Sequence, residues 1–269
     1  MASGQDMADE TIRKKPDEGI WETVKVVLQA LLIAFVIRTF FFQPFNIPSG
    51  SMIPTLWIGD YLFVNKLSYG YSKYSFNFTV SLFGNDLFSF GPLPFEGRIF
   101  AARPHRGDVV VFKLPRDTKT DYIKRLIGLP GDRIQVRHGV LYINGKEVPR
   151  KRIDDFIVPE GPQKGRHIRQ YRETLPNGVS YVVHDIFDDG MADNTGIYTV
   201  PPGHYFMMGD NRDNSTDSRF LNEVGYVPYE NLVGKAKIIF FSHKPEASIW
   251  QPWMWPFEIR WGRIGTWVH

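Results

Sequence analysis

The segment "DYIKRLIGLPGDRIQV" (residues 121–136), followed by "GVLYINGKEV" (139–148), decides the fold of this chain. Both segments carry runs of β-branched, aromatic and other apolar residues, which favour strands. The Pro-Gly-Asp triplet at 130–132 predicts a turn inside the first segment, and the Asn-Gly pair at 144–145 is a strong hairpin signal in the second. The sequence therefore predicts consecutive β-strands joined by tight turns.

Strand signals of the same kind recur on both sides of this region. They lie at residues 60–67, 108–115, 179–186, 204–208 and 232–241. The 269 residues include 24 Gly, 19 Pro, 21 Phe, 12 Tyr and 7 Trp, a composition that favours strands and turns over helices. We therefore expect a mainly β protein, with enough residues for one large β domain or two smaller units.

Net charge and cysteine content exclude several classes of function. A net charge of +3 is too small to imply binding to nucleic acid. The chain contains no cysteine, which excludes disulfides, thiol catalysis and cysteine-ligated metals.

One apolar segment, "VKVVLQALLIAFVIRTFFF" (residues 24–42), has the length of a membrane-spanning helix. A basic cluster at 13–15 precedes it, whereas residues 43–62 contain no Lys or Arg. By the positive-inside rule, the N-terminus is expected in the cytoplasm and the rest of the chain outside. A cleaved signal peptide is the first alternative, but the segment is long and no small-x-small site follows it. An amphipathic helix on the membrane surface is the second, and the apolar run at 31–37 argues against it.

Three further regions differ in composition. Residues 69–100 are rich in aromatic side chains and predict a long ribbon whose apolar face packs on the core or on lipid. Residues 150–200 are polar and predict an inserted lobe whose basic patches face solvent or anionic headgroups. Tryptophans at 250, 253, 255, 261 and 267 crowd the C-terminal end, where they contact the membrane interface or pack against the β domain. The sequence leaves these alternatives open.

The segment "NIPSGSMIPTL" (residues 46–56) follows the apolar segment and has an unusually constrained backbone. Pro48 and Pro54 each fix their own φ and push the preceding residue towards extended geometry. Gly50 supplies the freedom that a tight turn needs. By itself this pattern indicates only a surface turn, and whether Ser51 has a chemical role depends on the rest of the chain.

The commoner catalytic patterns are missing from the sequence. There is no H-E-x-x-H and no G-x-S-x-G. His184 and Asp185 are adjacent on a predicted strand and so point to opposite faces, which weakens a Ser-His-Asp triad. The loop at 209–220 lacks the Gly and Glu of a calcium-binding EF-hand, and loops of this composition are usually turns.

Lys124 is the remaining candidate for a base. By strand alternation it shares a face with Tyr122 and Leu126, which would surround its side chain with apolar atoms. At an ordinary pKa only about 0.04% of a lysine is neutral at pH 7, and burial to a pKa of roughly 8 raises this to about 10%. A serine hydroxyl needs such a base to become a nucleophile.

Five segments of the sequence resemble, in order, the conserved motifs of bacterial type I signal peptidases, the leader peptidases with a Ser/Lys dyad. They are "IPSGSMIPTL" (47–56), "GDYLFVNK" (59–66), "RGDVVVFKLP" (106–115), "DYIKRLIGLPGD" (121–132) and "MGDNRDNSTDSR" (208–219). The resemblance spans about residues 21–241 and weakens in the inserts at 69–100 and 150–200.

The resemblance implies a role for each matching residue. Ser51 is the expected nucleophile and Lys124 the general base, while the Ser49 hydroxyl and the Ser51 backbone N–H form the oxyanion hole. The supporting residues are expected to be Ser215, which orients the Lys124 ammonium group, the ion pair Asp217–Arg219, Tyr122, which shields the lysine, and Asp210, which holds the loop. The substrate pockets are expected to be shaped by Phe45, Ile47, Pro48, Met52 and Ile123. No metal or cofactor is implied.

The same resemblance implies the architecture and the reaction. We expect a β-barrel catalytic domain with an inserted smaller β lobe, preceded by one N-terminal transmembrane helix. The expected parts are a cytoplasmic tail at 1–20, an anchor at 21–43, the catalytic domain at 44–149 and 201–269, and the polar lobe at 150–200. Exported preproteins would be cut after Ala-x-Ala-type sites on the outer face of the bacterial inner membrane, near the export machinery. The bilayer is therefore an expected partner and nucleic acid is not.

Two other functions stay possible on the sequence. A self-cleaving Ser/Lys repressor would carry a DNA-binding helix-turn-helix where this chain has its apolar segment. A non-catalytic membrane-tethered scaffold would show damaged catalytic positions, whereas Ser49, Ser51, Lys124 and Ser215 are all present.

Overall fold

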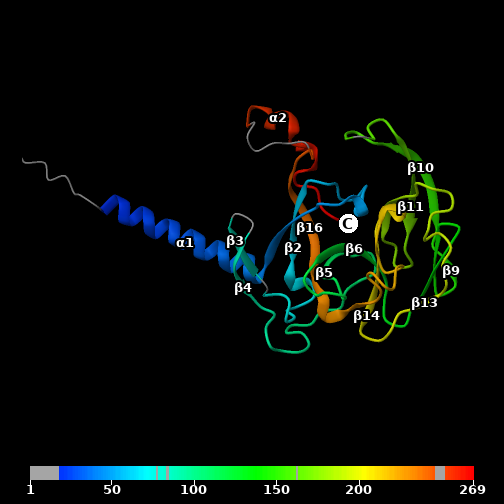
Figure 1. Cartoon of the computed structure of the whole chain (residues 1–269), viewed down its shortest axis with the longest axis horizontal. Helices are drawn as coiled ribbons and strands as arrows, with labels where there is room; N and C mark the ends of the chain where they lie inside the picture. Colours follow the sequence, from blue (N-terminus) through cyan, green and yellow to red (C-terminus); the bar gives the residue numbers. More distant parts are fainter. Residues whose placement is uncertain (1–17, 77, 83–84, 162, 246–251) are drawn as a thin grey trace, which may run out of the picture.

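The computed structural model describes residues 18–76, 78–82, 85–161, 163–245 and 252–269 (Figure 1). Helix α1 (Glu18–Phe40) projects away from the β-rich remainder. Its segment Gly19–Phe40 has a mean hydropathy of 2.0 and none of it is buried, so by length and composition it is a candidate membrane span. The helix ends at Phe40, within the predicted anchor at 21–43, and Phe42 already belongs to a strand, in which it pairs with Asn65.

A seven-stranded antiparallel sheet forms the main body, and it curls into a half-barrel in Figure 1. In spatial order its strands are β1 (Phe42–Asn46), β2 (Asp60–Asn65), β16 (Leu232–Ser242), β5 (Val109–Lys113), β6 (Asp121–Gly128), β14 (His204–Met208) and β15 (Val227–Pro228). Strands distant in sequence are thereby neighbours in space, as β14 is to β6. The mainly β fold expected from the sequence is confirmed.

Three smaller sheets complete the described chain. They are β13 (Tyr198–Thr199), β7 (Arg133–Arg137), β8 (Val140–Ile143) and β9 (Lys146–Glu147) in one sheet, β10 (Arg150–Ile157), β11 (His167–Thr174) and β12 (Ser180–His184) in another, and β3 (Phe78–Leu82) with β4 (Asn85–Phe90) in the last. The predicted turn at 130–132 separates β6 from β7. At the predicted hairpin, Asn144 and Gly145 have φ of 54° and 77°, as a type I′ turn requires.

One apolar cluster packs two of the smaller sheets against the main sheet, and another lies within the main sheet. One contains Ile127 and Phe206 of the main sheet together with Ile134, Leu141 and Val183 of the smaller sheets. The other lies inside the half-barrel, between β2, β5, β16 and the segment after β1. Burial of these side chains provides the main driving force for closing the fold, at about 25 cal/mol per Å² of apolar surface.

The structure describes the three regions of unusual composition to different extents. The backbone of the aromatic ribbon forms the β3–β4 hairpin, but the side chains of 77–90 lie outside the description. The polar region at 150–200 contains the sheet β10–β12. In the C-terminal segment, which includes α2 (Trp255–Glu258), Trp253 and Trp261 are exposed, while Trp250 and the basic cluster at 13–15 lie outside the described residues. The predicted domain boundaries and lipid contacts stay predictions.

Candidate active site

The serine turn lies directly after β1, where η1 (Gly50–Met52) makes a single short turn of helix. Backbone hydrogen bonds from Ile47 to Asp60 and from Gly59 to Ile47 hold the start of this turn against β2. Ser51 is buried, whereas Ser49 is exposed, and their hydroxyl oxygens are 3.5 Å apart. The constrained backbone thus places both hydroxyls on one side of the turn.

Lys124 reaches the same point from β6, which is a distant part of the sequence. Its Nζ donates hydrogen bonds to Ser51 Oγ at 2.7 Å and to the Ile123 carbonyl at 3.0 Å. The nitrogen also lies 5.2 Å from the centre of the Tyr122 ring, so the predicted shared face of residues 122 and 124 is present. The side chain is only 4% exposed. The structure therefore joins the predicted nucleophile and the predicted base by a direct hydrogen bond.

Burial lowers the pKa of Lys124 from 10.5 to about 8. The Asp217 and Asp210 carboxylates act in the opposite direction, but removal of the ammonium group from water is the larger effect. About 10% of the side chain is then neutral at pH 7, compared with about 0.04% for an ordinary lysine. The amine can accept a proton at a physiological pH.

The loop after β14 is hydrogen-bonded to the serine turn. The backbone N–H of Asn211 donates to the Ser51 carbonyl at 3.1 Å, and its side-chain Nδ2 donates to the Gly50 carbonyl, also at 3.1 Å. A Cβ atom on Gly209 would lie 2.2 Å from Ser215 Oγ and 2.6 Å from the Ser51 carbonyl oxygen. The loop and the turn are therefore in contact at a position where only glycine fits.

We expect Gly209→Ala to lower kcat/KM by about 100-fold, because the methyl group must displace the Ser51 backbone from its position beside Lys124. The measurement is peptide cleavage, with thermal unfolding as a check on folding. Gly178→Ala is not a fair control, since its φ is +84°, but Gly196→Ala is, because a Cβ there meets no atom within 4 Å. Wild-type activity in Gly209→Ala would contradict the close packing of loop and turn.

The predicted Asp217–Arg219 ion pair is present and buried. Arg219 Nε and Nη2 donate to the two carboxylate oxygens at 2.8 and 2.9 Å. Burial is the largest single effect and favours the neutral carboxyl, but the Arg219 guanidinium and the hydrogen bonds from Gly209 and Ser215 together lower the pKa of Asp217. Asp217 also accepts a hydrogen bond from the backbone N–H of Gly209, at 3.0 Å, so this pair braces the loop behind the dyad.

Ser215 differs from its expected geometry. Its hydroxyl is buried, and within the described residues no hydrogen bond joins it to the Lys124 ammonium group, although the resemblance implied one. It lies instead beside Asp217, where it helps to lower the pKa of that carboxyl. Lys124 donates instead to the Ile123 carbonyl. Ser215 packs against Gly209, so it lies in the loop that contacts the serine turn.

Asp210 has a partner that the sequence analysis did not identify. Arg125 Nε and Nη2 donate to its two carboxylate oxygens at 2.8 and 2.7 Å, and both side chains are buried. Arg125 Nη1 also donates to the carbonyls of Gly107 and His269, and Thr55 donates to Asp210 at 2.5 Å. A second charged residue directly after Lys124, followed by the apolar Leu126 and Ile127 in the same strand, was the available signal for this network.

A second missed ion pair connects the catalytic loop to the lobe. Arg212 Nη1 and Nη2 donate to the Glu173 carboxylate at 2.7 and 2.5 Å, and Tyr181 donates to the same carboxylate at 2.9 Å. Glu173 belongs to β11 and Tyr181 to β12. These residues are remote from Ser51 in sequence and match no catalytic pattern, so only the structure shows that the lobe supports the loop.

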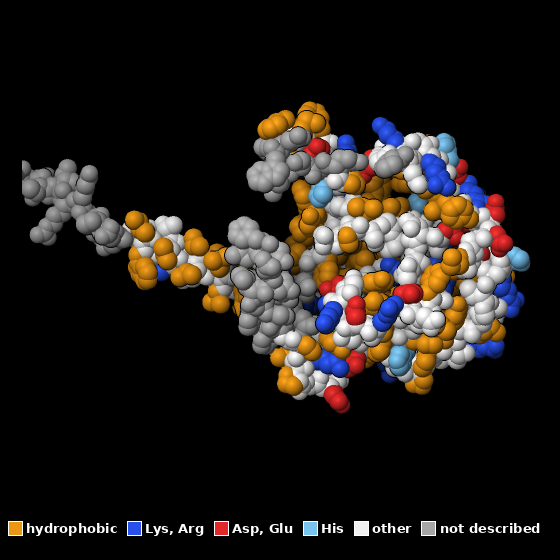
Figure 2. All heavy atoms as spheres, viewed as in Figure 1, with side chains coloured by type: hydrophobic (Ala, Val, Ile, Leu, Met, Phe, Trp, Pro, Cys, Tyr) orange, Lys and Arg blue, Asp and Glu red, His pale blue; other side chains and the backbone are white. Residues whose placement is uncertain are grey.

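The residues expected to shape the substrate pockets lie mostly together. Ile47 and Met52 are buried in the half-barrel cluster, and Phe45 and Ile123 are partly buried against it. Pro48 is exposed and is not part of that cluster. Figure 2 shows a hollow between the C-terminal segment and the β10–β11 hairpin, with hydrophobic side chains along it. Because Met52 directly follows Ser51 and Ile123 directly precedes Lys124, this apolar cluster lies next to the dyad.

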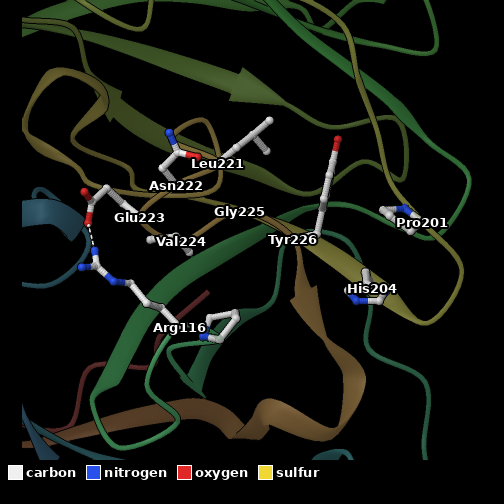
Figure 3. Close-up of a pocket in the computed structure, with 10 residues that line it drawn as sticks. Arg116, Pro201, His204, Leu221, Asn222, Glu223, Val224, Gly225 and Tyr226 are labelled. Atoms are coloured by element: carbon white, nitrogen blue, oxygen red, sulfur yellow. Dashed lines mark hydrogen bonds and ion pairs between the residues drawn. The ribbon is translucent and has the colours of Figure 1, made fainter.

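Other candidate sites do not combine these features. A pocket of about 360 Å³ lies between the segments around Arg116, His204 and Glu223, and contains neither Ser51 nor Lys124 (Figure 3). His184 is buried, burial lowers its pKa to about 4, and its ring contacts Gln170. Within the described residues, no group of three or more His, Cys, Asp or Glu side chains is placed to hold a metal ion.

Comparison with known proteins identifies the family of the chain. The family model described as signal peptidase, peptidase S26, matches residues 20–241. The chain is similar to a signal peptidase I of Rickettsia typhi, with 46% identity over 80% of this chain and 77% of the relative. A signal peptidase I of Rickettsia canadensis is 45% identical over 79% and 76%, respectively.

Among solved structures, the chain is similar to a signal peptidase I from Enterococcus faecalis V583, with 29% identity and a TM-score of 0.29. That alignment covers 50% of this chain and 97% of the solved chain. The family match extends over both halves of the site, from the serine turn to the loop after β14, and the relatives share nearly half of the aligned residues. The chain is therefore a member of the signal peptidase family, peptidase S26, and a serine endopeptidase that removes signal peptides.

Proposed function

We propose that Ser51 and Lys124 form the catalytic dyad of this peptidase. The main support is the 2.7 Å hydrogen bond between Lys124 Nζ and Ser51 Oγ. Both side chains are buried, and burial lowers the pKa of Lys124 to about 8. Neutral Lys124 accepts the hydroxyl proton as Ser51 Oγ attacks the carbonyl carbon of the scissile bond. The ammonium group then returns this proton to the leaving amine as the C–N bond breaks.

The acyl group is left as an ester on Ser51. Lys124, neutral again, takes a proton from the water that attacks the ester carbon. The ammonium group returns this proton to Ser51 Oγ as the ester C–O bond breaks, which releases the signal peptide as a carboxylic acid and restores the enzyme. In both tetrahedral intermediates the Ser51 backbone N–H and the Ser49 hydroxyl donate to the oxyanion. Ser49 Oγ is 3.5 Å from Ser51 Oγ, so a bond attacked by Ser51 lies within reach of Ser49.

The surrounding residues hold this geometry rather than react. Tyr122 covers the lysine, Asp217 with Arg219 and Asp210 brace the loop, and Ser215 fills the space beside Gly209. Substrate side chains would contact the partly buried Phe45 and Ile123 and the exposed Pro48, and the buried Ile47 and Met52 would lie beneath this surface and shape it. Shallow pockets there would favour Ala-x-Ala-type sites, because larger side chains would clash with buried neighbours.

The proposed location is the bacterial inner membrane. Helix α1 would span the bilayer with the N-terminus in the cytoplasm and the catalytic domain on the outer face, near the export machinery that delivers preproteins. A signal peptide is itself a membrane-inserted apolar helix, so the anchor would bring enzyme and cleavage site to the same surface.

The pH dependence of preprotein cleavage tests the dyad. Lys124 acts as a base only when it is neutral, and its pKa is about 8, so kcat/KM should rise with pH and level off above an apparent pKa near 8. Below that value it should fall about tenfold for each pH unit. Ser51→Ala should be inactive throughout. A wild-type profile that is flat from about pH 6 to about pH 9 would exclude a lysine base of this pKa.

A further inference from the structure

The end of helix α1 is bonded to side chains and backbone of the catalytic domain. The last carbonyls of a helix have no partner within the helix and need other donors. Here Lys66 Nζ donates to the Thr39 carbonyl at 3.3 Å, and the Tyr71 hydroxyl donates to the Phe40 carbonyl at 2.6 Å. The backbone N–H of Lys66 donates to the Phe41 carbonyl at 3.0 Å. The domain therefore caps the helix at successive residues.

Lys66 is held in place on the domain side as well. It is 3% exposed, and its Nζ donates to the Ser75 carbonyl at 2.5 Å, so one ammonium group connects the helix to the segment after β2. Burial and the Arg38 charge lower the pKa of Lys66 to about 8, although the Asp121 charge acts in the opposite direction. A lysine at a membrane surface usually extends into water, and this one is instead enclosed.

Aromatic packing reinforces the same contact. The Phe40 ring meets the rings of Tyr71 and Phe76 edge to face, with centroids 6.4 and 5.7 Å apart. Tyr71 and Phe76 are stacked on each other at 5.2 Å. Together Lys66, Tyr71 and Phe76 form what we term the anchor clamp, which contacts the final turn of α1 through both polar and apolar groups.

No flexible linker separates the helix from the sheet. Helix α1 ends at Phe40 and β1 starts at Phe42, where Phe42 pairs with Asn65 of β2, the residue before Lys66. Strand β1 then leads directly to the serine turn. With 23 residues, α1 is about 34 Å long, close to the thickness of the hydrocarbon core, so its clamped end lies at a membrane surface.

We propose that the anchor clamp fixes helix α1 to the catalytic domain and thereby sets the height of Ser51 above the bilayer. The clamp would make this enzyme select preproteins whose scissile bond lies at one distance from the membrane surface. A stiff tether of matching length maximises the effective concentration of a second, membrane-bound partner, whereas a loose tether spreads the site over many heights. This proposal rests on the proposed membrane anchoring.

The test compares a bilayer-inserted substrate with a soluble one. Four full-length enzymes are reconstituted in vesicles: the wild type, Lys66→Met, Tyr71→Phe and the double variant. The substrates are preproteins in which the spacing between the apolar helix and the cleavage site increases by one residue at a time. Wild type should show a sharp optimum of spacing. The double variant should lose about tenfold in kcat/KM at that optimum and show a broader profile.

A soluble peptide carrying the same cleavage site, assayed in detergent, separates positioning from stability. Its kcat and KM should change by less than about twofold in all clamp variants, because Ser51 and Lys124 are untouched. Tyr142→Phe is the matched control, since that hydroxyl donates to Glu147 away from the helix, and it should not alter the spacing profile.

The outcomes are distinct. If the clamp variants lose kcat/KM equally on soluble and inserted substrates, the clamp only stabilises the protein and the positioning role is refuted. An unchanged spacing profile in the double variant would also refute it. Failure of the dyad would appear separately, as soluble-peptide cleavage that survives Ser51→Ala.

Discussion

Lys124→Arg should abolish cleavage, with a loss in kcat of at least about 1,000-fold, although the positive charge is retained. Arginine cannot be deprotonated in a protein, so it cannot accept the Ser51 proton. Loss of one member of a nucleophile–base pair removes most of the rate enhancement in comparable hydrolases. The measurement is single-turnover cleavage of a preprotein, with Lys146→Arg as a control at an exposed lysine on β9.

Lys124→Met should be equally inactive but more stable. The folded protein holds Lys124 at a pKa of about 8, compared with 10.5 when unfolded, so burying the ammonium group costs about 3 kcal/mol at pH 7. Because the folded-state pKa is depressed, the wild type regains this stability as pH rises from about 8 to about 10.5, and the advantage of Lys124→Met should shrink over the same range. Activity in either variant would remove Lys124 from the mechanism.

Arg125→Met should lower the free energy of unfolding by about 3–5 kcal/mol. Arg125 is completely buried, and its removal leaves the Asp210 carboxylate buried without its cation. It also leaves the Gly107 carbonyl without this donor. Urea-induced unfolding in detergent, followed by tryptophan fluorescence, measures the change.

The double variant Arg125→Met/Asp210→Asn identifies the cause. Removal of the stranded charge should restore part of the lost stability, because the penalty comes chiefly from an uncompensated buried ion rather than from lost packing. Arg116→Met is the matched control, since Arg116 pairs with Glu223 at an exposed position and should change stability by less than about 1 kcal/mol. Equal destabilisation of the single and double variants would contradict this explanation.

Much of the strand order along the chain follows from local chemistry. Runs of β-branched and aromatic residues predict β2, β5, β6, β12, β14 and β16. The Pro-Gly and Asn-Gly pairs predict the turns at 130–132 and 144–145, where the structure has them. The apolar segment likewise becomes a single long helix because nothing interrupts it before Pro44. Such features depend on neighbouring residues alone and can be predicted without a fold.

The catalytic pair could be predicted only through resemblance of motifs. Ser51 and Lys124 are 73 residues apart, and neither differs locally from a turn serine or a strand lysine. The sequence shows that both are present, whereas their hydrogen bond requires β6 to lie beside the serine turn. The hydrogen bond expected between Ser215 and Lys124 shows the limit of this approach, because Lys124 donates to Ile123 instead.

By itself, then, the sequence determined the mainly β class, the apolar helix, the turns and the residues of the motifs. Only the tertiary structure decided which distant groups meet: Arg125 with Asp210, Glu173 with Arg212, and Lys66 with the end of α1. The physical reason is that propensity acts between neighbours, whereas buried charges take partners wherever the closed sheet brings them, because an unpaired charge in the interior costs several kcal/mol.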